Sequence, residues 1–399
     1  MERKSTLYKP FVAELNRLKE KYGEKMFKLS GISDEQLDES KMMDNLIDSN
    51  VTADVSIDPT SNIGNMDIDV IMHEVQKPQF KIKSLNRLFK DMVNLYGMDI
   101  ANEWLENEIT GALYLHDGFE ASFKPYCYNY TCETVAKKGM FFDPALKADV
   151  AKHLHSFHEH MLEFVRFCTK RQSGSVGIGD FLIWSNYFFN KDKKEGFLGI
   201  TDWEKYKEQN FQNFVYSLNQ SGARAGQSAF TNVSIFDREY LYALFAEKTY
   251  PDGSLVIDYV EDIIQYQKDF LDFLKKERAK KLLTFPVLGA SLLFKNGKFV
   301  DEEFARFCSD HIYLWKDLPI MCEDDVTSVS SCCRLKSDLK TMGLFSSIVG
   351  ASSEIGSIKV STVNLNRIGL DVEFNKEKFF ELLKHRSLVN LKIINAQRK

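Results

Sequence analysis

The sequence lacks the marks of secreted and membrane proteins. Its 399 residues include only seven cysteines and eight prolines. The odd number of cysteines, without a Cys-x-x-Cys pair or regular spacing, argues against a disulfide framework or a zinc ribbon and indicates a reducing compartment. No stretch approaches the roughly 20 apolar residues of a membrane span, and the charged start does not resemble a signal peptide. We therefore expect a cytoplasmic protein.

An excess of charge of one sign is also missing. The 52 Lys and Arg residues against 57 Asp and Glu residues give a formal net charge of −5. Without a long block of one sign, nothing indicates a surface that binds polyanions. Neither nucleic acid nor a membrane is an expected partner. Hydrophobic residues make up 44% of the chain, enough for the core of one large α/β domain or of two to three smaller ones.

Hydrophobic spacing predicts helices that alternate with strands. Apolar residues at three- and four-residue intervals predict helices within residues 1–47 and 82–109, with a polar, irregular segment at 48–66 between them. The same spacing predicts further helices, at 145–170, 255–280 and 302–314, and an apolar run at 283–288 reads as a short buried strand. This alternation favours an α/β architecture with a largely parallel sheet.

Four histidines lie on the helix predicted at 145–170. His155 and His158 share a face at i, i+3, a spacing that suits a metal ion, but no carboxylate completes a ligand set such as H-E-x-x-H. We expect a solvated, histidine-rich helix face here.

Two polar loops are candidates for ligand binding. The glycine-rich run at 172–180 could bring backbone N–H groups close to a phosphate, yet it lacks the full G-x-G-x-x-G and the P-loop lysine. A tight turn between two helices explains this run equally well. The polar run at 224–235, which contains Asn232, suits recognition of a sugar or phosphate or hydrogen bonding between loops.

The cysteines near the end of the chain are unusual. Cys332 and Cys333 are adjacent and cannot easily bridge each other, and an apolar, strand-like run that includes Asn364 follows them. We interpret Cys333 as a reactive sulfur and Asn364 as an amide that orients a substrate. Cys127, beside a proline in a strand-like stretch at 124–129, is by itself better explained as a packed core thiol.

Taken in chain order, six motifs resemble one family, the class III, oxygen-sensitive anaerobic ribonucleoside-triphosphate reductases, which are glycyl radical enzymes. The motifs are Leu115-His116-Asp117, Pro125-Tyr126-Cys127, Arg224 to Asn232, Phe285-Pro286-Val287-Leu288, Cys332-Cys333-Arg334-Leu335 and Gly356 to Ile368. The resemblance implies part of a ten-stranded α/β barrel of the ribonucleotide reductase and pyruvate formate-lyase type, flanked by helices. We expect an N-terminal helical and irregular segment at 1–75, then the first part of the barrel at 76–399, with its finger loop at about 325–355.

The resemblance also implies roles for individual residues. Cys333, at the tip of the finger loop, would become a thiyl radical that takes the ribose 3′ hydrogen in a barrel interior closed to water. Cys127 would supply a hydrogen from the opposite sugar face as the 2′ hydroxyl leaves as water, with formate as the expected reductant; Cys132 competes for this role. Asn364 would hydrogen-bond the ribose hydroxyls. Weaker candidates for substrate binding are Cys332, Arg334, His116 and Asn232, and no metal ligand is expected in these residues.

Some features of the family are missing from the sequence. Family members continue with a four-cysteine zinc ribbon and with an Arg-x-Cys-Gly-Tyr-like loop whose glycine stores the radical, and neither motif occurs in the 399 residues. An N-terminal ATP-cone signature is not found either. Asn366 replaces the proline that the family usually has, two residues after Asn364. We therefore expect the N-terminal portion of a reductase, active once it is completed by a C-terminal part that bears the glycyl radical and the structural zinc.

The expected reaction is the reduction of ribonucleoside triphosphates to deoxyribonucleoside triphosphates. Expected partners are the substrate, dNTP and ATP effectors, the C-terminal fragment, a second copy of the chain in a homodimer, and an activating enzyme that uses S-adenosylmethionine and an iron–sulfur cluster. Two alternatives stay open. One is a non-catalytic nucleotide-binding or assembly subunit, and the other is a different glycyl radical enzyme, since pyruvate formate-lyase-like enzymes also carry two adjacent cysteines.

Overall fold

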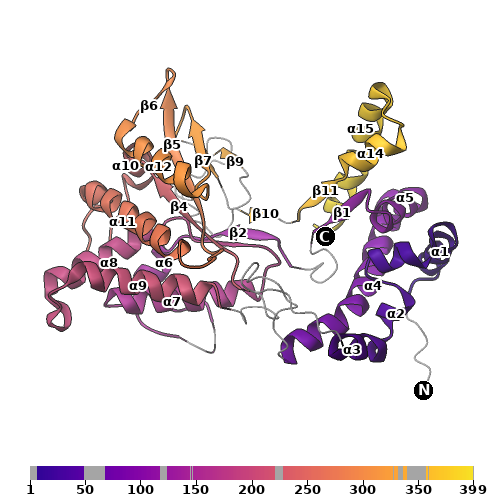
Figure 1. Cartoon of the computed structure of the whole chain (residues 1–399), viewed down its shortest axis with the longest axis horizontal. Helices are drawn as coiled ribbons and strands as arrows, with labels where there is room; N and C mark the ends of the chain where they lie inside the picture. Colours follow the sequence, from indigo (N-terminus) through magenta and orange to yellow (C-terminus); the bar gives the residue numbers. More distant parts are fainter. Residues whose placement is uncertain are drawn as a thin grey trace. The chain divides into compact units, whose positions relative to one another are not determined.

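The computed structural model describes residues 7–48, 68–116, 124–143, 145, 147–220, 228–326, 328–330, 336–338, 356–357 and 359–398. Among these residues two compact units form (Figure 1), and the first combines segments that are distant in sequence. Unit 1 holds the described residues up to 48, those from 68 to 126 and those from 357 onward, and unit 2 holds those from 127 to 356. The boundary expected at 75/76 falls inside a continuous helix, so the two units do not follow it.

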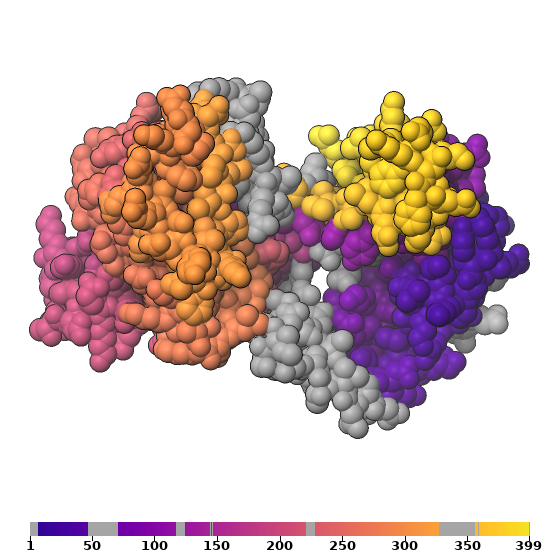
Figure 2. Space-filling model, turned by 45° about the horizontal axis from the view of Figure 1, so that its top comes forward, coloured from indigo at the N-terminus to yellow at the C-terminus, as the bar shows by residue number. Residues whose placement is uncertain are grey.

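Unit 1 is mainly helical. Its elements are α1 (Lys9–Leu29), α2 (Asp34–Leu37), α3 (Glu39–Asp48), α4 (Ile68–Tyr96), α5 (Met98–Ile109), β1 (Leu113–Leu115), β11 (Ser361–Val363), α14 (Leu365–Asp371) and α15 (Lys376–Ala396). The chain turns between α4 and α5 at Gly97, whose φ of 86° favours glycine. Helix α15 packs against α4 and α5. Figure 2 shows the C-terminal residues, in yellow, next to the violet and indigo residues of the earlier helices.

Unit 1 has its own core. Trp104 of α5, Phe89 of α4 and Val389 of α15 are almost completely buried in one apolar cluster. Strands β1 and β11 pair antiparallel next to this cluster, with Leu113 opposite Val363. The unit is therefore held together by residues that lie nearly 300 positions apart in the sequence.

Unit 2 alternates strands and helices. Its elements are β2 (Cys127–Asn129), α6 (Glu133–Lys138), α7 (Leu154–Thr169), β3 (Val176–Gly177), α8 (Phe181–Glu195), η1 (Phe197–Gly199), α9 (Trp203–Leu218), β4 (Thr231–Phe236), α10 (Arg238–Phe245), η2 (Val256–Tyr259), α11 (Val260–Arg278), β5 (Val287–Lys295), β6 (Lys298–Phe299), α12 (Glu302–Trp315), β7 (Ile320–Glu323), β8 (Ser328–Ser330), β9 (Lys336–Asp338) and, at the unit boundary, β10 (Gly356–Ser357).

The main sheet is built from parallel strands. Strands β2, β3, β4, β5 and β7 lie side by side in that order, and each neighbouring pair is parallel. Strand β10 borders β2, and β6 pairs antiparallel with the end of β5. Because helical connections link successive parallel strands and each strand adds on the same side, the order is that of part of an α/β barrel. This confirms the predicted α/β architecture.

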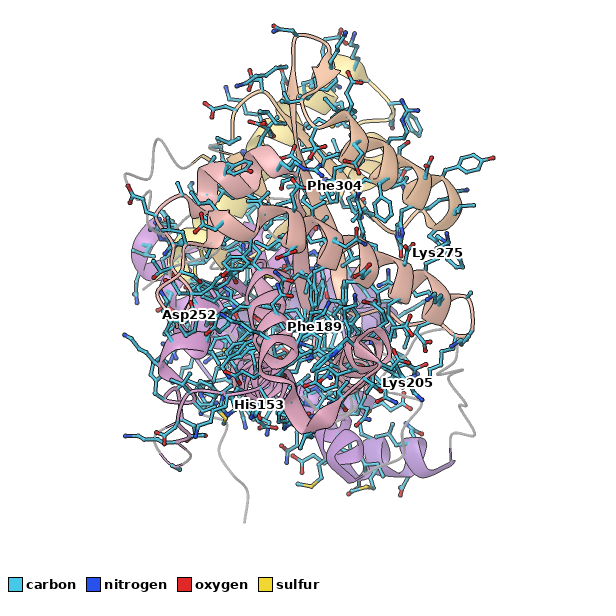
Figure 3. The ribbon with its side chains drawn as sticks, turned by 90° about the vertical axis from the view of Figure 1, so that its left-hand side faces the viewer. His153, Phe189, Lys205, Asp252, Lys275 and Phe304 are labelled. Atoms are coloured by element: carbon cyan, nitrogen blue, oxygen red, sulfur yellow. The ribbon has the colours of Figure 1, made fainter. Side chains whose placement is uncertain are left out.

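Aromatic side chains fill the space between the helices of unit 2. Phe189 on α8, labelled in Figure 3, is one of these residues. The centroid of its ring lies 6.4 Å from that of Trp203 and 5.7 Å from that of Tyr266. Such tilted and edge-on ring pairs stabilise a core beyond their buried area. These ring contacts pack helices α8, α9 and α11 against one another.

Two sequence predictions for unit 2 change. The run at 172–180 is not a turn between helices, because it contains β3, which hydrogen-bonds to strands on both sides. A two-residue strand is too short to show a two-residue hydrophobic period. The strand expected at 283–288 instead spans Val287–Lys295.

The histidine-rich helix face is not a solvated face as a whole. His158 is completely buried, with its Nε2 2.6 Å from Ser185 Oγ and its Nδ1 3.2 Å from the carbonyl oxygen of Asn210. Burial lowers the pKa of His158 to about 3, so this side chain is neutral. His155 is exposed. In the described part of the chain, no group of three or more His, Cys, Asp or Glu side chains could hold a metal ion.

Each helix in the described ranges is too short or too polar to cross a membrane.

Candidate active site

The central strands of unit 2 place small and polar residues in one row. Asn129 of β2 lies in register with Gly177 of β3, which lies in register with Asn232 of β4. Val287 of β5 continues the row. Residues in register on neighbouring strands point to the same face of a sheet. Two amides therefore flank a glycine on one face.

The opposite face of the same strands is apolar. Val176, Val233 and Ile235 are completely buried there within the core that the helices cover. Strands of a parallel sheet covered on both faces usually carry apolar residues on both. The polar face of β2, β3 and β4 is therefore not needed for packing alone and is the natural place for ligand recognition.

Cys127 lies on this polar face. It precedes Asn129 by two residues in β2, so the two side chains point the same way. Its side chain is 4% exposed, its Sγ accepts a hydrogen bond from the backbone N–H of Ser175 at 3.2 Å, and it forms no disulfide. The strand thus holds a thiol next to the two amides.

Gly177 leaves room for these amides. A Cβ at this position would come within 1.8 Å of Asn129 Oδ1 and within 2.8 Å of Asn232 Oδ1. Cβ atoms do not approach other atoms so closely, so a larger residue would displace at least one amide. The Asn232 side chain is 6% exposed, and its Oδ1 has no hydrogen-bond partner in the described structure.

Cys132 has a different environment. It is completely buried in the apolar core beside the carboxylate of Asp180. Burial, followed by the charge of Asp180, raises the pKa of the Cys132 thiol well above its usual value. Asp180 accepts hydrogen bonds from Thr131 Oγ1 at 2.7 Å, from the Cys132 backbone N–H at 2.9 Å and from Trp184 Nε1 at 2.9 Å. This cluster ties the end of β2 to the start of α8.

The site candidates in unit 1 lie at opposite ends of the β1–β11 ladder. Asn364 follows β11 and caps α14: its Oδ1 accepts from the Arg367 N–H at 2.9 Å and its Nδ2 donates to the Gly111 carbonyl oxygen at 3.0 Å. His116 follows β1, and its Nε2 lies 2.8 Å from Thr362 Oγ1. The structure therefore does not bring Asn364 and His116 together, whereas it places Cys127 and Asn232 on one face.

Comparison with known proteins identifies the chain. The model of a family described as anaerobic ribonucleoside-triphosphate reductase matches residues 77–399. The chain belongs to this family.

Solved structures agree with the family assignment. The chain is similar to the anaerobic ribonucleotide reductase of Thermotoga maritima in complex with dATP and CTP, with 37% identity and a TM-score of 0.84. It is also similar to the same protein with dATP bound in the specificity site, with 36% identity and a TM-score of 0.83. Another structure, described as an anaerobic ribonucleotide reductase, matches with 37% identity and a TM-score of 0.83. These matches cover 99 to 100% of this chain but only 61 to 63% of the other chains. No curated protein matches.

The similarity confirms the predicted fold class, part of an α/β barrel of the reductase type with flanking helices. The remaining reductase candidates, Cys332, Cys333 and Arg334, lie outside the described residues, as does most of the expected finger loop. Strands β8 and β9, which precede and follow residues 331–335, pair antiparallel, with Ser330 opposite Lys336.

Sequence reasoning missed two residues of the polar face. The alternation in Cys127-Tyr128-Asn129 places Asn129 on the face of Cys127, and this signal is available once the strand is assigned. Gly177 gives no comparable signal, because its importance depends on which strands flank it.

Proposed function

We propose that the chain forms the N-terminal and central part of an anaerobic ribonucleoside-triphosphate reductase, and that the polar face of β2, β3 and β4 binds the ribose of the substrate. The observation that supports this most is the position of Cys127, a thiol on a face of amides and small residues, in a chain that belongs to this family. The T. maritima relative, which was solved with CTP and dATP, supports a nucleotide substrate and a nucleotide effector.

In this proposal the two thiols act on opposite faces of the ribose. Cys333, as a thiyl radical, takes the 3′ hydrogen atom and later returns it. The 2′ hydroxyl leaves as water while the Cys127 thiol supplies a hydrogen, and formate, oxidised to carbon dioxide, provides the two electrons. Asn364 would orient the ribose hydroxyls, which requires its amide to exchange the contacts with Arg367 and Gly111 for contacts with the substrate.

The surroundings of the thiols favour Cys127 over Cys132 as the second catalytic thiol. A hydrogen donor must reach the substrate, and Cys127 lies on the polar face of the sheet. Cys132 is enclosed by apolar side chains and is hydrogen-bonded to Asp180. We therefore assign Cys132 a structural role.

The proposal includes the partners of a complete reductase. The glycyl radical, formed by an activating enzyme with S-adenosylmethionine and an iron–sulfur cluster, and the structural zinc would reside on the remainder of the reductase. We further propose dNTP and ATP as effectors, a homodimer, and a cytoplasmic location, where thiols stay reduced.

The test compares cysteine variants of the complete reductase, activated anaerobically. With CTP, dATP and formate, we expect Cys127→Ser to lower dCTP formation at least a hundredfold. Cys132→Ala should retain activity, and Cys322→Ser, which changes an exposed thiol, serves as the matched control. Equal activity of Cys127→Ser and the parent protein would refute the role of Cys127. A parent protein that binds nucleotides and its partner but forms no dCTP would favour the assembly subunit.

A further inference from the structure

Two amides converge on one point above Gly177. The Oδ1 atoms of Asn129 and Asn232 both lie within 3 Å of the position that a Cβ of residue 177 would occupy. Both atoms are hydrogen-bond acceptors, and rotation of either amide would present its donor instead. This point on the polar face therefore offers two adjustable hydrogen-bonding groups.

The geometry leaves one of these groups unsatisfied. Asn232 as a whole residue is only 6% exposed, and its Oδ1 has no hydrogen-bond partner in the described part of the chain. A buried amide oxygen without a hydrogen bond is unfavourable. The neighbours of Asn232 in the row, Gly177 and Val287, have no polar side-chain atom that could satisfy it. A donor on a bound molecule would do so.

The composition of the face indicates which chemical group binds. The side chains on the polar face of β2, β3 and β4 are uncharged; they belong to Cys127, Asn129, Asn232, Ser234 and Phe236. A triphosphate carries several negative charges and is normally bound by cationic side chains or clustered backbone N–H groups. Neutral hydroxyl groups, which donate and accept, match amides better.

We propose that Asn129 is a further substrate-binding residue, that it acts as a pair with Asn232 on the ribose hydroxyls, and that residue 177 is glycine to leave room for the Asn129 amide. This inference rests on the proposed function, because it takes a ribonucleotide as the ligand. It adds a residue, Asn129, and a steric requirement at position 177.

The first experiment measures the affinity for CTP by calorimetry, with the complete reductase and dATP present. Loss of one neutral hydrogen bond corresponds to roughly a tenfold change in affinity. We expect Asn129→Ala to weaken CTP binding about tenfold and to raise KM in parallel. Binding of 2′,3′-dideoxy-CTP, which lacks both hydroxyls, should change less than about twofold. An equal loss for both nucleotides would overturn the assignment to the ribose hydroxyls.

The second experiment tests the steric requirement with a double-mutant cycle. Gly177→Ala should weaken CTP binding at least about tenfold, because its Cβ displaces the Asn129 amide. In Asn129→Ala/Gly177→Ala the 1.8 Å clash with the Asn129 amide is gone and only the milder 2.8 Å approach to Asn232 Oδ1 remains, so the double variant should bind CTP within about threefold of Asn129→Ala. Additive losses, about a hundredfold in total, would show that Gly177 does not act through Asn129.

One control variant separates an effect on folding from an effect on CTP binding. The combined outcomes also separate failure of this inference from failure of the proposed function. Gly369→Ala adds a methyl at another buried glycine, where the nearest atom is 3.6 Å away, and should leave CTP binding unchanged. If the parent protein forms dCTP but Asn129→Ala alters neither Kd nor KM, the inference fails and the proposed function stands. If CTP binding depends on the ribose hydroxyls as predicted but no dCTP forms, the inference stands and the proposed function fails. A parent protein that does not bind CTP overturns both.

Discussion

The carboxylate of Asp180 should control access to Cys132, and Asp180→Asn is the substitution that shows it. Its Oδ2 accepts hydrogen bonds from Thr131 Oγ1 and Trp184 Nε1, and its Oδ1 accepts one from the Cys132 backbone N–H. An asparagine has one oxygen in place of two. Whichever way the amide is oriented, its NH₂ group faces an N–H donor, of Cys132 or of Trp184.

These hydrogen bonds set the expected free-energy cost of Asp180→Asn. A hydrogen bond to a charged group contributes about 1.5–3 kcal/mol, and an unsatisfied buried donor costs about 1–3 kcal/mol. Relief of the buried charge offsets part of the loss, because burial raises the pKa of Asp180 and so disfavours its ionised form. We expect a net cost of about 2 kcal/mol to the local structure, which corresponds to a population of the opened state that is roughly 30-fold higher.

Thiol labelling under native conditions measures this opening. Mass spectrometry would follow the reaction of iodoacetamide with Cys132, which is completely buried in the parent protein. We expect the labelling rate of Cys132 to rise about 30-fold in Asp180→Asn. The control is Asp252→Asn, in an exposed turn where Asp252 accepts hydrogen bonds only locally, from Ser254 (Figure 3). A labelling rate within about twofold of the parent value would refute the reasoning.

Two more predictions concern buried polar groups. Gln267 is completely buried and exchanges two hydrogen bonds of 2.9 Å with the backbone of Phe236. Gln267→Glu should therefore lower the free energy of unfolding by about 2–4 kcal/mol at pH 8, and by less at pH 5, where a protonated carboxyl can still donate a hydrogen bond. The control is Gln265→Glu at an exposed position, and equal urea midpoints for the two variants would contradict the prediction. Burial raises the pKa of Glu108 from 4.5 to about 7. The folded state therefore loses stability as the pH rises: the loss is absent below pH 4.5 and reaches ~3 kcal/mol above pH 7, since one pKa unit is ~1.36 kcal/mol. Glu108→Gln should therefore stabilise the protein at pH 8 and leave it nearly unchanged at pH 4, and a stability gain that does not depend on pH would disprove the mechanism.

Local patterns in the sequence predict much of the fold. The helices and the parallel α/β architecture follow from hydrophobic spacing, as with the stripe that forms the buried face of α11. The burial of His158 was missed although it continues the apolar stripe of Leu154 and Met161, because its polar partner Ser185 lies on another helix. The pairing of β1 with β11 joins segments about 250 residues apart, and no local pattern indicates it.

In the candidate site, too, local motifs indicate single residues, whereas their arrangement depends on contacts between distant segments. Motifs indicate Cys127 and Asn232 one at a time, but only the register of β2, β3 and β4 shows that they share a face with Asn129. The role proposed for Gly177 depends on two side chains from neighbouring strands, each about 50 residues away. Asn364 illustrates the opposite case, because the structure gives its amide a helix-capping contact that a role in substrate binding would have to replace.

The most direct test of the proposed function is the anaerobic formation of dCTP from CTP by the complete, activated reductase carrying Cys333→Ala. If Cys333 forms the thiyl radical, the parent protein forms dCTP with formate as reductant, and the variant forms none while it binds CTP with unchanged affinity. Formation of dCTP by Cys333→Ala at the parent rate would contradict the proposed function at its central step.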